Sequence, residues 1–144
     1  MAGLTGGPGG EIYLATVEDF GDLLFYEVWQ AQPPFTDRDS DWENLGLPLE
    51  AEDSPCAEAH AIIAGPGGEV YYAWAEPCIG RILLAVSLGD GDWFTLDAEI
   101  TIDGVTPGRP LELAVGPEGI VYVAWIAPTS GINGQAGVGA FLPG

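Results

Sequence analysis

The chain has 144 residues, of which 47% are hydrophobic, and this composition excludes an intrinsically disordered protein. Its 22 acidic residues stand against three arginines and no lysine, which gives a formal net charge of −19. Such a charge repels nucleic acid and anionic membranes, and no apolar run reaches the roughly 18 residues that a membrane helix needs. We therefore expect a globular protein that neither binds nucleic acid nor inserts into a membrane.

A short segment that occurs three times sets the expected architecture. It begins at Gly7, Gly65 and Gly116, and it reads Gly-Pro-x-Gly-x, then a β-branched residue, tyrosine, a variable residue and alanine. A period of about fifty residues is typical of repeat proteins, in which each unit buries its face against a neighbour. The 22 glycines and 12 prolines indicate many turns between short strands.

In chain order, the first unit contains a weak strand over 1–6, strands over 12–17 and 23–28, and an acidic turn before Trp42. The second unit repeats this order, with strands over 59–64, 70–75, 82–86 and 94–100. The third unit has strands over 111–115, 121–126 and 137–141 and lacks a fourth. Each unit is therefore expected to be an antiparallel meander.

The Gly-Pro-x-Gly segments are expected to form hairpin turns. The strand after each turn is apolar on both faces, so it is expected to be covered on both sides. Over 94–100, Phe94, Leu96 and Ile100 alternate with polar residues, which predicts an outer strand with one wet face.

These patterns predict an all-β fold of about three four-stranded, propeller-like blades over 1–50, 51–108 and 109–144, the last without its outer strand. Propellers have roughly four to eight blades, so three blades do not close a ring. Copies would then join into a ring or filament, by strand exchange for example, or the chain is part of a larger propeller.

The second unit resembles the sialidase-type Asp-box propellers. Gly65-Pro66-Gly67-Gly68-Glu69-Val70-Tyr71-Tyr72-Ala73-Trp74 is followed by Ser87 and by Leu88-Gly89-Asp90-Gly91-Asp92-Trp93, where that family has Ser-x-Asp-x-Gly-x-Thr-Trp. The aspartate is displaced by one position, and Asp92 stands in place of the threonine. The first unit keeps only Asp39-Ser40-Asp41-Trp42.

In that family the Asp-box is a structural turn, and catalysis at the propeller axis uses three arginines, an aspartate and a tyrosine–glutamate pair. This chain also has three arginines, Arg38, Arg81 and Arg109, but only Arg109 precedes an inner strand. The resemblance thus implies a fold without implying catalytic residues. We expect the chain not to be an enzyme.

Cys56 and Cys78 flank the hairpin of the second unit at nearly equal distances from its turn. This register predicts a disulfide between them, and two free thiols are the alternative. A disulfide indicates an oxidising compartment, so the expected location is extracellular or at the cell surface.

Two candidate sites share the loop before Trp42. Asp37, Asp39 and Asp41 alternate as carboxylates do in calcium loops, which makes calcium the candidate cofactor and a solvated acidic turn the alternative. Trp29, Phe35, Asp37 and Asp39 form a candidate ligand patch, because aromatic rings beside carboxylates suit sugar binding.

The single histidine and four of the tryptophans are expected to have structural roles. His60, the single histidine, is predicted to be a hydrogen-bonded core or edge residue. Trp74 and Trp125 are predicted to pack between units, and Trp42 and Trp93 to anchor the acidic turns.

The sequence favours a non-catalytic, secreted or surface-exposed module that self-associates into a homo-oligomer or polymer and serves structure or recognition. A glycan-binding, lectin-like propeller is the second interpretation. A fragment of a sialidase-like glycoside hydrolase is the third.

Overall fold

The structure is a computed structural model that describes residues 2–19, 24–35, 42–46, 48, 58–76, 80–88, 92–96, 100–101, 111–128 and 134–141. These residues form twelve strands and no helix, so the all-β class is confirmed and none of them belongs to a helix that could span a membrane. The strands are β1 (Ala2–Gly6), β2 (Ile12–Asp19), β3 (Leu24–Ala31), β4 (Trp42–Asn44), β5 (Glu58–Ala64), β6 (Val70–Glu76), β7 (Arg81–Ser87), β8 (Phe94–Thr95), β9 (Ile100–Thr101), β10 (Glu112–Val115), β11 (Val121–Pro128) and β12 (Gly134–Phe141).

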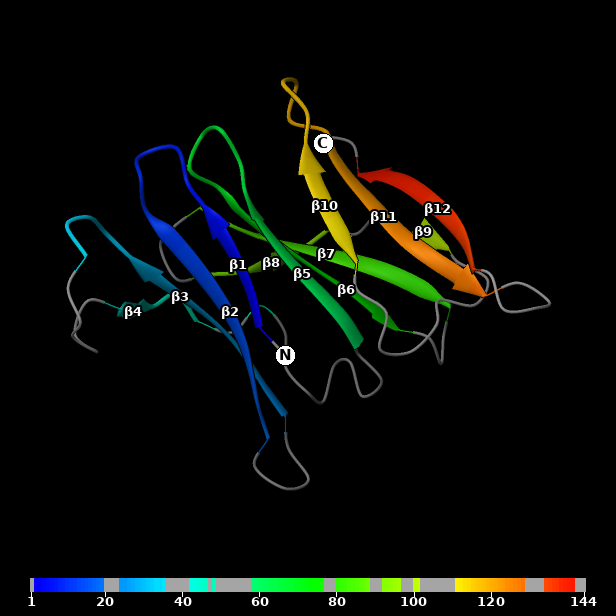
Figure 1. The fold of residues 1–144 in the computed structure, drawn as a ribbon, viewed down its shortest axis with the longest axis horizontal. Helices are drawn as coiled ribbons and strands as arrows, with labels where there is room; N and C mark the ends of the chain where they lie inside the picture. Colours follow the sequence, from blue (N-terminus) through cyan, green and yellow to red (C-terminus); the bar gives the residue numbers. More distant parts are fainter. Residues whose placement is uncertain are drawn as a thin grey trace.

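Consecutive strands pair antiparallel into three sheets (Figure 1). Sheet 1 has the order β1-β2-β3-β4, and sheet 3 has the order β10-β11-β12. Sheet 2 has the order β5-β6-β7-β8, and β9 also pairs with β7. The first strands of the sheets, β1, β5 and β10, lie side by side in the middle of the molecule.

The three repeated turns have the same geometry. In the first, the Gly7 amide donates to the Glu11 carbonyl at 2.8 Å, and the Gly10 amide donates to the Gly7 carbonyl at 3.3 Å. The other two turns repeat both hydrogen bonds. Gly10, Gly68 and Gly119 have φ between 82° and 87°, the left-handed region that residues with a Cβ atom avoid. The predicted hairpins are therefore confirmed.

Each sheet has two faces, because successive residues of a strand point to opposite sides. We call the face that carries the repeated Tyr-x-Ala pair the front face, and the opposite face the rear face. The front face of sheet 1 packs on the rear face of sheet 2, where Tyr72 and Trp74 are buried. The front face of sheet 2 packs in turn on the rear face of sheet 3, where Val121 and Val123 are buried. Sheet 2 is thus enclosed on both sides.

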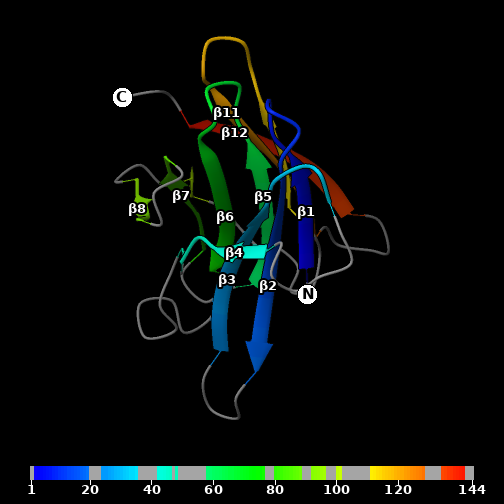
Figure 2. The same cartoon turned by 90° about the vertical axis from the view of Figure 1, so that its left-hand side faces the viewer.

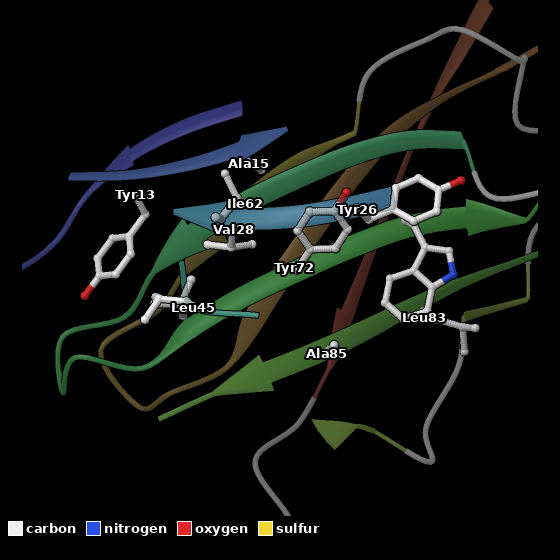
Figure 3. Close-up of a cluster of buried hydrophobic side chains, with 11 residues drawn as sticks. Tyr13, Ala15, Tyr26, Val28, Leu45, Ile62, Tyr72, Leu83 and Ala85 are labelled. Carbon is white, nitrogen blue, oxygen red and sulfur yellow. The ribbon is translucent and has the colours of Figure 1, made fainter. Parts of the chain in front are cut away.

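Figure 3 shows the joint between sheets 1 and 2 from within. Tyr26 and Val28 of sheet 1 meet Ile62 and Tyr72 of sheet 2, and all four side chains are at most 8% exposed. Each such large apolar side chain contributes about 1.5–3 kcal/mol when it is fully buried. Trp74 is buried in this joint and Trp125 packs against the second one, as their sequence positions predicted.

Two sequence expectations need correction. The strand β2 is covered only on its front face within the described chain, and β11 only on its rear face, because sheets 1 and 3 are the outer layers of the stack (Figure 2). Phe94 was expected on the buried side of its strand, yet it is 57% exposed, because β8 pairs with β7 over two residues alone. The described sheets form an open stack, in line with the expectation that three units do not close a ring, and the propeller itself stays a prediction.

Candidate functional site

The two outer faces of the stack carry three of the six exposed large apolar side chains of the described residues. On the rear face of sheet 1, Leu4 is 67% exposed and stands opposite Leu14, which in turn pairs with Trp29. On the front face of sheet 3, Val138 is 70% exposed and Tyr122 is 41% exposed. Apolar side chains gathered on one face mark an interaction surface, whereas single ones do not.

A polar and aromatic cluster joins sheets 1 and 2. His60 of β5 shares a 2.7 Å hydrogen bond between its Nδ1 atom and the Tyr72 hydroxyl. The ring of Tyr26, from sheet 1, lies 4.7 Å from the His60 ring between centroids. Burial lowers the pKa of His60 to about 4 and raises the pKa of Tyr72 above its ordinary value. His60 is therefore neutral at pH 7, shares this hydrogen bond with the tyrosine hydroxyl, and serves as the hydrogen-bonded residue that was predicted.

A second polar pair lies at the end of the β6–β7 hairpin. The Arg81 guanidinium contacts the Glu76 carboxylate, whose side chain is fully buried. The Glu76 Oε2 atom has no hydrogen-bond partner among the described residues. A buried carboxylate depends on its cation, so this pair fixes the hairpin end. Glu76 and Arg81 are cross-strand partners in the β6–β7 hairpin, and opposite charges on either side of that turn are the signal by which this pair could have been found.

The repeated turns carry a glutamate that folds back over them. The space where Gly7 would have a side chain is filled by the carboxylate of Glu11, and the same holds for Gly65 and Glu69. The Tyr13 hydroxyl donates to Glu11 Oε1 at 3.3 Å. Burial first, and then the charge of Glu11, raises the pKa of Tyr13. The spacing Glu-x-Tyr in the first two repeats places both side chains on one face, and it is the signal by which this pair could have been found.

The acidic turn of the second unit contributes a contact between sheets. The Trp93 indole nitrogen donates to the Leu45 carbonyl of the first unit at 2.9 Å. Its ring meets the edge of Tyr72 at a centroid distance of 6.5 Å. Trp93 therefore contacts both sheet 1 and sheet 2 and helps to hold them together, whereas its predicted role was to anchor its own acidic turn.

The predicted ligand patch is described only in part. Trp29 lies in β3 on the rear face of sheet 1 and is partly buried, and Phe35, beyond the end of β3, is 47% exposed. Its acidic members, and the candidate calcium ligands, lie outside the described residues: Asp37, Asp39 and Asp41. Cys56 and Cys78 lie outside them as well. The described residues contain no group of three or more metal-ligating side chains.

In chemical terms, the described polar groups stabilise the fold. His60, Glu76 and Glu11 each have a partner within the protein. The outer faces are among the parts of the described molecule that are open to a partner.

No protein-family model matches the chain, and no curated protein matches it. Among solved structures, the chain is similar to an exo-β-1,3-galactanase from Clostridium thermocellum, with 16% sequence identity and a TM-score of 0.53. The match covers 88% of this chain and 31% of the galactanase chain. The chain thus shares its all-β fold with about a third of that enzyme.

Proposed function

We propose that the chain is a self-associating structural or recognition module. One observation carries this proposal: the stack ends on both sides in apolar faces of the same kind as those that pack inside it. Apolar side chains such as Leu4 and Val138 gain free energy when a partner removes them from water. The net charge of −19 opposes association between copies at low salt, and added salt screens that repulsion.

Size-exclusion chromatography with light scattering, over a range of protein and salt concentrations, tests this proposal. We expect a discrete multiple of the 15.0 kDa chain mass that is favoured by salt. A mass of 15.0 kDa under every condition would refute self-association.

A glycan-binding role is the second candidate, and the resemblance to a galactanase together with exposed Phe35 favours it. Titration calorimetry with β-1,3-galacto-oligosaccharides tests it, with Phe35→Ala as the weakened variant. Phe94→Ala is the matched control, because Phe94 is also an exposed phenylalanine but lies on β8, far along the chain from the loop. Equal heats for both variants and the unchanged protein would remove this candidate.

The third candidate is a part of a glycoside hydrolase, since the matched galactanase is such an enzyme and the chain spans about a third of it. We propose instead that the chain alone does not catalyse hydrolysis. Sugar released from β-1,3-galactan by the purified chain would contradict this.

An extracellular or cell-surface location belongs to the same proposal, through the expected Cys56–Cys78 disulfide. Mass spectrometry of the unreduced protein after proteolysis tests it. A linked peptide pair is expected, and two alkylated thiols would remove the argument for that location.

A further inference from the structure

Equivalent positions of the repeat show what the outer faces lack. On the rear faces, Leu4, Ile62 and Leu113 each pair with the residue between the repeated tyrosine and alanine. Ile62 is 8% exposed and Leu113 packs against the second core, because each faces the sheet before it. Leu4 is 67% exposed at the same position of sheet 1. Leu4 is exposed because no sheet precedes sheet 1 among the described residues.

On the front faces, the equivalent residues are buried by the following sheet in sheets 1 and 2 and are exposed in sheet 3, which no described sheet follows. Val28, Leu84 and Val138 each pair with the alanine of the repeat. The first two are fully buried against the following sheet, whereas Val138 is 70% exposed. Tyr13 and Tyr122 differ likewise, at 3% and 41%.

The rear faces of the sheets also share one feature, a tryptophan side chain, although it does not always come from the same strand. On the rear face of sheet 3, the space at Gly137 is filled by the ring of Trp125, so a large residue on the second strand lies over a small one on the third. On the rear face of sheet 1, Thr16 occupies the position of Trp125 and pairs with Glu27, whereas Trp29 lies on the third strand opposite Leu14. Each rear face therefore carries at least one tryptophan.

We propose that the front face of sheet 3 packs on the rear face of sheet 1 of a second copy, in the manner of the two joints inside the chain. The partner is a second copy because the contact continues an interface that the chain already makes twice, always front on rear. Such a contact joins two different faces and runs head to tail, so it closes into a ring or extends as a filament. This inference rests on the proposed self-association and specifies its faces.

The number of copies follows from the number of sheets. Two copies supply about six blade-like sheets, which lies within the range of about four to eight found in closed propellers, whereas three copies would exceed that range. We therefore infer a ring of two copies with two identical joints. Sheets 1 and 3 lie on opposite sides of sheet 2, so both faces are available for this closure (Figure 1).

One residue in the proposed joint departs from the pattern. Gly3, Ala61 and Glu112 occupy equivalent positions, each opposite the alanine of the repeat. A Cβ atom on Gly3 would lie 3.0 Å from the side chain of Ile62, so this position meets the neighbouring sheet at close range. The exposed Glu112 carboxylate would face Leu4 of the second copy, which weakens the joint. Glu112→Ala is therefore expected to tighten it.

Sedimentation velocity on five proteins at high salt tests the inference: the unchanged chain, Leu4→Glu, Val138→Glu, Leu88→Glu and Glu112→Ala. Leu4 and Val138 are largely exposed in the single chain, so their substitution leaves its fold intact, as circular dichroism should confirm. Leu88 is the control, because it is 71% exposed but follows β7 of the enclosed sheet 2. We expect a discrete species of twice the chain mass for the unchanged chain and the control.

Each of the two face variants should weaken association at least about tenfold, because a carboxylate replaces an apolar contact. Glu112→Ala should strengthen it. Disruption by only one of the two variants would indicate a symmetric contact between like faces and overturn the head-to-tail arrangement. Association untouched by either variant, or an open series of sizes, would also overturn this inference but leave self-association standing. A monomer under every condition would overturn both.

Discussion

The protonation of His60 offers a sharp test of the joint between sheets 1 and 2. The folded pKa is about 4, and the ordinary value is 6.5. Between these values the unfolded chain binds more protons than the folded one, so acid favours unfolding. The stability that neutral His60 contributes is complete above pH 6.5 and is lost as the pH falls towards 4. Proton linkage makes this loss about 2 kcal/mol at pH 5 and about 3 kcal/mol at pH 4.

The assay compares urea unfolding of the unchanged chain and His60→Asn between about pH 7.5 and about pH 4. The asparagine of this variant has an amide oxygen that can accept a hydrogen bond from the Tyr72 hydroxyl, and it does not titrate. Acidic residues titrate alike in both proteins, so the difference between the two curves isolates the histidine. Because His60 is the single histidine, proton NMR also follows its ring directly. Parallel stability curves, or a ring that titrates near the ordinary pKa of 6.5, would refute the buried, neutral assignment.

Two substitutions test other parts of the fold. Arg81→Met leaves the buried Glu76 carboxylate without its cation and should cost about 3 kcal/mol in urea unfolding, most of which Glu76→Gln in the same chain should restore. No loss in the single variant would show that the carboxylate reaches solvent. Gly68→Ala forces an alanine to φ 87° and should cost about 1–2 kcal/mol. Gly6→Ala, where a Cβ atom meets open space, should change stability by less than about 0.5 kcal/mol, and equal costs for the two would contradict the turn geometry.

Local patterns predicted the strands well because they are repeated and strongly apolar. Gly10, Gly68 and Gly119 marked the turns correctly, since the left-handed conformation that they adopt favours glycine. The weak first strand also formed, because β1 pairs with β2 in full register despite its poor composition.

The sequence could not tell which apolar faces are covered, because covered and open faces have the same pattern. Leu4 and Ile62 are equivalent by pattern, but they differ in exposure because sheet 1 is the end of the described stack. The contact Trp93–Leu45 depends on tertiary geometry that spacing does not encode, whereas Arg81 and Glu76 are cross-strand partners of one hairpin and follow from its register. The predicted calcium ligands and the cysteine pair stay predictions.

The stacking of sheet 1 on sheet 2 is the basis of this account, and nuclear Overhauser spectroscopy of the His60 ring at neutral pH tests it most directly. Cross-peaks to Tyr72 report the pairing of β5 with β6 within sheet 2 and serve as the internal control. Cross-peaks to Tyr26, whose ring centroid lies 4.7 Å away, report the contact between sheets. We predict both sets, and Tyr72 cross-peaks without those to Tyr26 would contradict the stacked arrangement.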